Sequence, residues 1–526
     1  MFKLLRRKFF LFFGLAIMAL PVLAGKVLTN PGCESDPTSH SQTLIGWTSY
    51  GSNSYNETGA AARSGSNYLK VYQGFTSAVN YTGIYQDYIS GPGATYTADG
   101  WAKTISADTL AGQNAAWLEV TFRDASGHQL ALYRSSVINT NAIFAGTFPK
   151  NLWVNLPVTN QYNPATYAIT NTAQTLVAPP GTYFVRYQVV FQGDAANSGG
   201  SVYFDDFNLN LTSASAYGDW NIVWSDEFNG TNINTNTWTY DLGGGGWGNS
   251  ELEYYTSRTN NAFTSGGLLH IVARKETTNS SSYTSARMKT QGRVAWKYGR
   301  FEWRARLPAG TGFWPALWFL GTNITSVSWP GCGEMDVIEN NGAVTNYVGG
   351  ALHCGSDSSD TYTFPDGGAV TNFHNYVLDW STNAFLWYVD GHLYQIQTNW
   401  TSNLSGAVYP APFDKPCFII MNLAVGGNYV GNPSVTSINT NGGFPGELQV
   451  DYLRVFDQTA PLQLSLTRTN NALRLVWPSN VVAHLQAQLN PLYGSLGTNW
   501  LDLIPPTNPA SINPTNRNAY YRLQSP

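Results

Sequence analysis

The most informative stretch of this 526-residue chain is Trp329-Pro330-Gly331-Cys332-Gly333-Glu334-Met335-Asp336-Val337-Ile338-Glu339-Asn340. It holds three carboxylates, Glu334, Asp336 and Glu339, in a β-prone context. Side chains alternate between the faces of a regular strand, so Glu334 and Asp336 share one face and Glu339 points to the other. One extra residue, a bulge at Val337 or Ile338, would return Glu339 to the first face. We therefore predict a bulged strand that presents three acids on one surface.

Clustered acids split their pKa values, and glycoside hydrolysis uses such a pair. One carboxylate attacks the anomeric carbon and the other protonates the leaving oxygen. A retaining enzyme holds the two carboxyls about 5–5.5 Å apart, whereas the Cα atoms of Glu334 and Glu339 would lie roughly 13 Å apart along a strand. The side chains must therefore lean inward, as they can on a concave sheet. The alternative is an acidic, solvated strand face, which the neighbouring Trp, Met and Cys residues disfavour.

The composition excludes several classes of protein. Charged residues make up 11% of the chain, against about 25% in an average domain, and aromatic residues make up 14%. This is neither a disordered chain nor a coiled coil. The net charge of −4 and the lack of a long basic run argue against a nucleic-acid partner. Short runs of alternating hydrophobicity between Gly, Asn and Ser turns predict an all-β protein that stacks aromatic rings on a neutral ligand.

The chain divides into five segments by pattern. Residues 1–24 read as a signal peptide, with a charged start and an apolar stretch that ends at Val22-Leu23-Ala24. A membrane anchor is the alternative for that stretch. Residues 25–213 form a first β-sandwich, 214–219 a polar linker, 220–457 the longest β unit and 460–526 a small C-terminal β module. We expect an exported chain that is secreted or periplasmic, with no membrane contact after cleavage, and that acts as a monomer.

The acidic stretch Glu334–Glu339 resembles the ExDxxE signature of glycoside hydrolase family 16 in its bulged form. The resemblance runs through almost all of 220–457 and is strongest for the laminarinase branch, the endo-β-1,3-glucanases. Further matching stretches are 247–256, 283–290, 297–302, 313–318, 388–391 and 422–428. The resemblance implies a β-jelly-roll sandwich with a substrate cleft across its concave sheet.

The resemblance also implies roles for individual residues. Glu334 would be the nucleophile, Asp336 its assisting acid and Glu339 the acid/base. The substrate would be bound by Trp314, Trp318, Asn249, Glu251, Arg287 and His353. No organic cofactor is implied, but a structural calcium is, with Glu227, Asp451 and the Gly267 carbonyl as ligands.

Two other features accompany the resemblance. Cys332 and Cys354 depart from the family pattern and could form a disulfide if a hairpin joins the catalytic strand to the next. Residues 25–213 resemble carbohydrate-binding modules of the jelly-roll type, with four candidate stacking residues, Tyr50, Tyr55, Tyr85 and Trp101. A tethered module of this kind would raise the local substrate concentration.

Together these observations predict a secreted, retaining endo-glycosidase that hydrolyses laminarin-type β-1,3-glucan. One alternative is a hydrolase of the same family that acts on mixed-linkage β-glucan, agarose or carrageenan. Another is a non-catalytic β-glucan-binding protein, which the presence of both glutamates disfavours.

Overall fold

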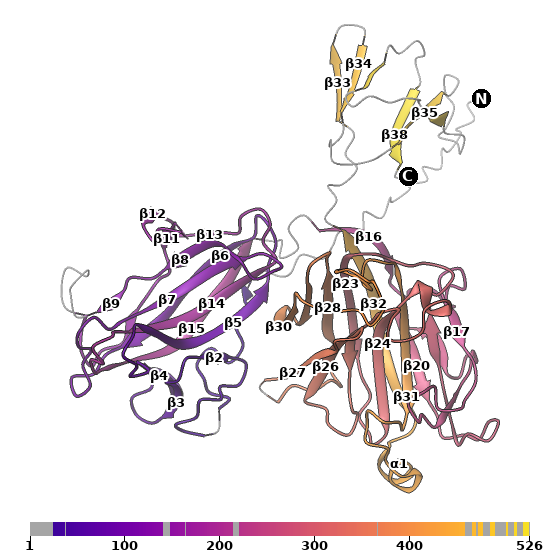
Figure 1. Cartoon of the computed structure of the whole chain (residues 1–526), viewed down its shortest axis with the longest axis horizontal. Helices are drawn as coiled ribbons and strands as arrows, with labels where there is room; N and C mark the ends of the chain where they lie inside the picture. The colour runs from indigo at the N-terminus through magenta and orange to yellow at the C-terminus, as the bar shows by residue number, and fades with distance from the viewer. Residues whose placement is uncertain are drawn as a thin grey trace, which may run out of the picture. The chain divides into compact units, whose positions relative to one another are not determined.

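The computed structural model describes residues 25–36, 38–139, 148–163, 165–213, 220–365 and 367–457, and six strands between 465 and 524. The predicted signal peptide and the predicted linker lie outside the described residues. The chain divides into two compact units, one within the first 218 residues and one from Asp219 onward. The all-β prediction is confirmed (Figure 1). No helix among the described residues has the length and apolar character needed to span a bilayer.

The first unit consists of two antiparallel sheets. One has the order β10 (Val154–Asn155), β6 (Thr95–Lys103), β15 (Ser201–Ser213), β4 (Asn67–Tyr72) and β3 (Ser54–Thr58), with β1 (Gly25–Lys26) on β15 and β13 (Leu176–Val177) on β6. The other has the order β12 (Ile169–Thr172), β11 (Asn160–Tyr162), β8 (Gln129–Arg134), β7 (Ala115–Arg123), β14 (Phe184–Gly193) and β5 (Asn80–Ile89), with β2 (Thr48–Tyr50) on β5 and β9 (Ile138–Asn139) on β7.

The second unit also contains two antiparallel sheets of this size. The first, called here the outer sheet, has the order β30 (His392–Gln397), β29 (Phe385–Val389), β28 (His374–Trp380), β23 (Gly299–Arg306), β32 (Gly446–Asp457), β20 (Leu268–Ala273) and β19 (Ala262–Ser265), with β16 (Asn221–Asp226) on β32. The second, the inner sheet, has the order β17 (Thr239–Asp241), β22 (Arg287–Lys289), β31 (Cys417–Val425), β24 (Phe313–Gly321), β25 (Glu334–Glu339), β26 (Tyr347–His353) and β27 (Ser358–Thr363).

The core of the second unit lies between its inner and outer sheets. Phe301 of the outer sheet packs edge-on against Phe319 of the inner sheet, with ring centroids 4.8 Å apart. Met335 and Met421 join the same buried cluster. Because side chains alternate along a strand, a strand that sends Met335 into this core sends its neighbours to the opposite face. The inner sheet therefore has one apolar face against the core and one face free to build a site.

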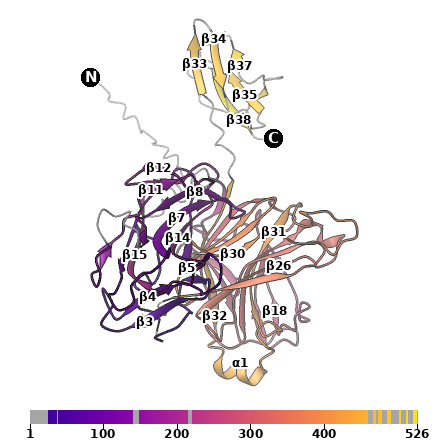
Figure 2. The ribbon, with the colours of Figure 1, turned by 60° about the vertical axis from the view of Figure 1, so that its left-hand side comes forward.

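Smaller elements complete the second unit. Strand β18 (Glu253–Tyr255) pairs in parallel with β21 (Tyr283–Ser285). A 3-10 turn, η1 (Thr322–Thr325), follows β24, and the one α-helix among the described residues is α1 (Val435–Asn441). The C-terminal strands, yellow in Figure 2, are β33 (Ser465–Thr469), β34 (Ala472–Val476) and β37 (Ala510–Ile512) in one sheet and β36 (Leu501–Asp502), β35 (His484–Leu489) and β38 (Ala519–Gln524) in another.

The disulfide that the sequence left open between Cys332 and Cys354 is not formed. All four cysteines, which lie within the described residues, are free and buried. The reason is the register of the β25–β26 ladder, in which Glu334 pairs with His353. Because the two strands are antiparallel, the next residue, Cys354, is opposite Gly333 and not opposite Cys332.

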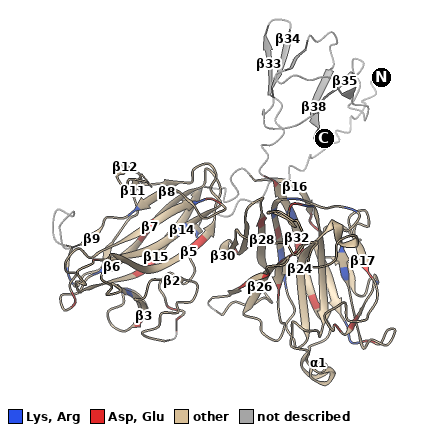
Figure 3. Ribbon diagram, viewed as in Figure 1, with Lys and Arg blue, Asp and Glu red and all other residues tan. Residues whose placement is uncertain are grey.

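Charged residues are sparse along the ribbon (Figure 3). The side chains of one ion pair, Arg300 and Asp379, are buried in the second unit. Arg300 and Asp379 face each other on β23 and β28 and form two hydrogen bonds of 2.7 and 2.8 Å. Their side chains are 0% and 1% exposed. Tyr388 also donates to Asp379, over 3.2 Å. Because each charge here is paired and hydrogen-bonded, the pair is tolerable in the core, but removing one partner leaves a buried charge.

We predict that Asp379→Ala lowers the free energy of unfolding by about 3–5 kcal/mol, because it leaves the Arg300 charge buried and uncompensated. Denaturant unfolding of the full chain measures this. The control is Lys415→Ala, which removes an exposed pair with Asp414 and should change stability by no more than about 1 kcal/mol. Equal small losses in the two variants would contradict the assigned role of the buried pair.

Candidate active site

A bulge in β25 brings the three acids to one face. Trp318 of β24 pairs with Asp336 and Leu317 pairs with Ile338, so Val337 has no partner across the ladder. The same break appears on the β26 side of the strand, between Asp336 and Glu339. Val337 and Ile338 both pack into the core, which returns Glu339 to the face of Glu334 and Asp336. The predicted bulge is confirmed at Val337.

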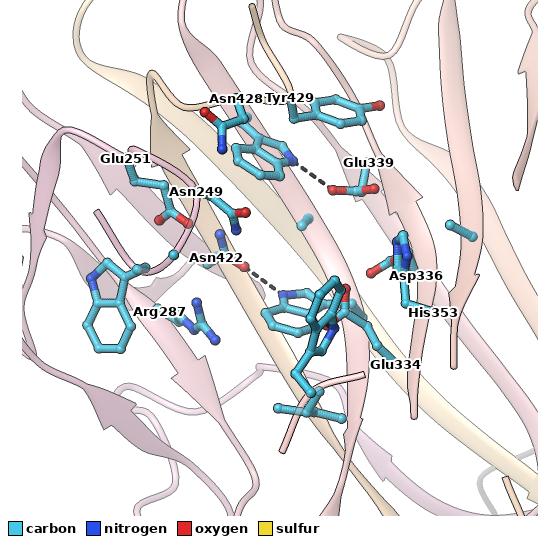
Figure 4. Close-up of a pocket in the computed structure, with 18 of the residues that line it drawn as sticks. Asn249, Glu251, Arg287, Glu334, Asp336, Glu339, His353, Asn422, Asn428 and Tyr429 are labelled. Carbon is cyan, nitrogen blue, oxygen red and sulfur yellow. Dashed lines mark hydrogen bonds and ion pairs between the residues drawn. The ribbon is translucent and has the colours of Figure 1, made fainter. Parts of the chain in front are cut away.

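The three acids lie in a groove of about 640 Å³ on the inner sheet (Figure 4). All nine residues predicted to act on the substrate or bind it line this groove, from four segments of the chain: Asn249 and Glu251; Arg287; Trp314 and Trp318; Glu334, Asp336, Glu339 and His353. Their location in one groove is observed, whereas their individual roles remain predictions.

Two indoles hold the two glutamates. Nε1 of Trp314 donates to Oε1 of Glu339 over 2.8 Å, and Nε1 of Trp329 donates to Oε2 of Glu334 over 3.1 Å. Tyr429 stacks on Trp314 with ring centroids 5.1 Å apart and planes 14° apart. Trp314 is nearly buried, whereas Trp329 is 53% exposed. An N–H donor favours the ionised form of a carboxyl, so both indoles fix the orientation of a glutamate and oppose its protonation.

Asp336 lies between the glutamates and is paired with a histidine. Nε2 of His353 lies 3.4 Å from Oδ2 of Asp336, and Nδ1 of His353 lies 2.9 Å from Oδ2 of Asp357. The hydrogen bond to Asp336 is the largest cause that raises the pKa of His353 to about 10. His353 is thus an imidazolium near neutral pH, with an acceptor at each ring nitrogen. It supplies a positive charge next to the acids.

Burial raises the pKa of each acid in this group. Burial and then the charge of Asp336 raise the pKa of Glu339 to about 8, against the opposing effect of the Trp314 hydrogen bond. Burial and then Asp336 also raise the pKa of Glu334, while His353 lowers it. These groups titrate together, so their protons belong to the cluster. The arrangement keeps one carboxyl protonated near neutral pH beside a carboxylate that His353 stabilises.

The far wall of the groove holds an arginine between two indoles. The guanidinium of Arg287 lies 5.1 Å from the ring of Trp247 and 4.8 Å from that of Trp318. Asp241 lies behind it, with a carboxylate oxygen 3.0 Å from Nε. Nε1 of Trp318 donates to Oδ1 of Asn422 over 2.8 Å. The wall is therefore a rigid set of ring faces and N–H donors, which suits a ligand that presents hydroxyls and apolar ring faces.

The residues predicted to bind calcium do not fit a cation as they are arranged. Both carboxylates are engaged by arginines: Glu227 makes two hydrogen bonds with Arg454, of 2.9 and 2.8 Å, and Asp451 pairs with Arg304 over 2.5 Å. Calcium would have to displace both guanidinium groups. Glu334, Asp336 and His353 bring three ligand atoms within 4.8 Å of one another, but the proton on His353 opposes a metal there.

The groove residues without a predicted role include three aromatic residues and two asparagines: Trp247, Trp329, Tyr429, Asn422 and Asn428. Several of them lie in the sequence next to stretches that were identified. Trp247 and Asn422 begin two of the segments that carry the family resemblance, and Trp329 precedes Glu334 by five residues. Strand pairing brings these segments to the same face, and spacing along the chain does not reveal it.

In the first unit, ring faces proposed for sugar stacking are covered by neighbouring side chains. The guanidinium of Arg186 lies 3.6 Å from the ring of Tyr85, and that of Arg63 lies 3.8 Å from the ring of Trp101. Tyr55 stacks on His40 with ring centroids 4.2 Å apart. The binding function of this unit remains a prediction.

Comparison with known proteins links the groove to a family. Residues 249–453 match the family model of the glycosyl hydrolases family 16. Glucan endo-1,3-beta-glucosidase A1 of Niallia circulans is 35% identical over 304 residues, which are 53% of this chain and 44% of that relative. The match thus spans less than half of that relative. Beta-glucanase of Rhodothermus marinus is 42% identical over 249 residues, 45% of this chain and 85% of the relative.

Among solved structures, the laminarinase catalytic domain of Thermotoga maritima MSB8 is 40% identical to this chain. The match covers 45% of this chain and 98% of that domain, with a TM-score of 0.41.

We predict that Asp336→Asn lowers the pKa of His353 from about 10 toward the ordinary histidine value of about 6.5, since it removes the carboxylate whose charge and hydrogen bond raise it. The ring-nitrogen resonances of His353, followed by NMR against pH, measure this. Asp357→Asn is the matched control and should cause a smaller decrease, because Asp357 contributes less to the shift. An unchanged titration in Asp336→Asn would contradict the pairing. The stability that His353 contributes is present below about pH 6.5 and is lost as pH rises through its folded pKa.

Proposed function

We propose that this protein, which belongs to the glycosyl hydrolases family 16 and is a glycoside hydrolase, cleaves β-1,3-glucan. The proposed cleavage is at internal bonds of the polysaccharide and retains the anomeric configuration. The observation that carries the proposal is the bulge at Val337, which sets Glu334 and Glu339 on one face of the groove. Family membership leaves several polysaccharides open, so the substrate is part of the proposal.

In the first step, protonated Glu339 gives its proton to the glycosidic oxygen while Glu334 attacks the anomeric carbon. The bond between that carbon and the leaving oxygen breaks, and an ester bond to Glu334 forms. The raised pKa of Glu339, about 8, suits an acid that must hold its proton near neutral pH. Burial raises the pKa of Glu334 as well, and the His353 charge acts against that rise. The Trp329 N–H also favours the carboxylate of Glu334, the form that attacks.

In the second step, Glu339 is a carboxylate and takes a proton from water. The resulting hydroxide attacks the anomeric carbon from the face that the leaving group occupied, and the ester bond to Glu334 breaks. Glu339 ends the cycle protonated. Asp336 and His353 are not consumed: their pairing holds charge next to Glu334 and limits its motion.

A neutral glucan fits the charges that line the groove. Of the described lining residues, the acids Glu251, Glu334, Asp336 and Glu339 outnumber the cations, which are Arg287 and His353. Arg287 is already paired with Asp241. A sulfated chain such as carrageenan would meet net repulsion here. The ring faces of the groove suit stacking against the apolar faces of glucose units. Mixed-linkage β-glucan and agarose are neutral too, and the test must include them.

The proposal extends to the compartment. The charged and then apolar pattern of residues 1–24 supports export, either to the periplasm or to the medium.

We predict that Glu334→Gln abolishes hydrolysis of laminarin and that Glu339→Gln slows it by about 10²–10⁴-fold. A reducing-sugar assay on laminarin, lichenan, agarose and carrageenan measures both the loss and the preference of the wild type. Glu276→Gln, outside the groove, is the control and should retain full activity. Wild-type rates in a correctly folded Glu334→Gln variant would refute the assignment. A wild type that releases sugar from agarose but not from laminarin would refute the substrate.

A further inference from the structure

A second pair of acids lies in the wall of the groove, away from the three described above. Glu251 lines the groove, and Glu253, at the start of β18, is 0% exposed. The two residues are separated by one position in an extended segment, so their side chains leave the same face. The reaction proposed above uses neither of them, and a buried acid without a counter-charge needs an explanation.

Glu253 is arranged as a protonated acid. Its Oε2 accepts the Val425 N–H over 2.6 Å. Its Oε1 is buried and receives no N–H or O–H from the described residues. The carboxyl of Glu251 is its neighbour on the same face and is close enough to raise the pKa of Glu253 through its charge and as a hydrogen-bond partner. Two carboxyls can share a hydrogen bond only if one of them keeps a proton. Burial and then the charge of Glu251 raise the pKa of Glu253 well above its ordinary value.

A directed chain of hydrogen bonds runs from Glu251 to the indole in the groove. Tyr255 donates its hydroxyl proton to Oε2 of Glu251 over 2.8 Å. Nδ2 of Asn422 donates to the Tyr255 oxygen over 3.2 Å, and Oδ1 of Asn422 accepts from Nε1 of Trp318 over 2.8 Å. The hydroxyl of Tyr255 has one proton. Because it goes to Glu251, the amide of Asn422 is fixed in the orientation that holds Trp318.

We propose that Glu253 is a positioning residue: it holds a proton that it donates to Glu251, keeps Glu251 a carboxylate, and through Tyr255 and Asn422 fixes Trp318 for substrate binding. A second negative charge on Glu253 would repel Glu251. A proton on Oε2 of Glu251 would prevent that oxygen from accepting the Tyr255 hydroxyl proton. The side-chain amide of Asn422 could then rotate, because its orientation depends on Tyr255. The inference rests on the proposed function for its kinetic readout.

Few titratable groups surround Glu253. Glu251 and Tyr255 come from its own segment. Tyr283 of β21 is opposite Glu253 in the parallel pair, and burial raises its pKa, so it stays neutral. Arg287 of β22 acts on Tyr255, whose pKa it lowers against the larger effect of burial. The residues of β31 that contact the pair, Asn422 and Val425, do not ionise. Any proton uptake here therefore belongs to the two glutamates.

The first experiment tests the proton without using activity. If folded Glu253 is protonated, the wild type binds a proton that its unfolded chain releases above about pH 4.3, so its stability falls as pH rises. Glu253→Gln has no such cost, because the amide can donate to Glu251 and accept from Val425. The melting temperature of Glu253→Gln relative to the wild type should rise by about 3 °C or more between pH 5 and pH 8.

The matched control for that series is Glu276→Gln. Hydrogen bonding from Thr284 lowers the pKa of Glu276. The difference in melting temperature between Glu276→Gln and the wild type should therefore stay constant between pH 5 and pH 8. A flat difference for Glu253→Gln would mean that folded Glu253 is ionised and would overturn the proposal. A growing difference supports it, whether or not the protein hydrolyses β-glucan.

The second experiment tests positioning. We expect Glu253→Ala to raise KM for laminarin about tenfold, because the variant loses a buried hydrogen bond. The change in kcat should be smaller. Glu253→Gln should recover most of the wild-type KM. An equal rise of KM in both variants would contradict the proposal, and if the alanine variant does not fold, the melting-temperature series of Glu253→Gln decides. A wild type inactive on every β-glucan would refute the proposed function instead.

Discussion

One extra residue in one strand is the constraint on which the site depends. Val337 lies between two paired positions of β25 and has no partner of its own on β24. Without it, strict alternation would send Glu339 into a core of Met and Phe side chains. With it, Val337 and Ile338 both fill that core, and the strand returns Glu339 to the groove. The rest of the inner sheet supports this geometry: β24 supplies Trp314 to hold Glu339, and β26 supplies His353 to pair with Asp336.

The electrostatics of the groove follow from burial in a chain with few charges. Each acid here has a raised pKa because burial removes it from water. Three groups that carry a proton oppose the rise in pKa: the indole N–H groups of Trp314 and Trp329 and the imidazolium of His353. His353 opposes the protonation of both glutamates. Such sites cost stability, a common property of catalytic groups.

Much of the site could be predicted because the relevant signals were local. The spacing of Glu334, Asp336 and Glu339 required a bulge, and the strand has one. The sequence does not show the register across a ladder, nor the partners that a side chain finds far along the chain. The Cys332–Cys354 disulfide was excluded by a one-residue offset across a ladder. Arginines hold the two carboxylates predicted to bind calcium, Glu227 and Asp451. Glu253 looked like any strand acid, because the sequence does not show that it is fully buried.

In the proposed mechanism, Glu334 forms a covalent bond with the sugar before water releases it. The most direct measurement is the configuration of the anomeric centre in the first product, followed by proton NMR during the first minutes of hydrolysis of a laminarin oligosaccharide. Two displacements at one carbon give retention, so the β-anomer should appear first and then equilibrate to the mixture. Initial release of the α-anomer would mean a single displacement by water and would contradict the account.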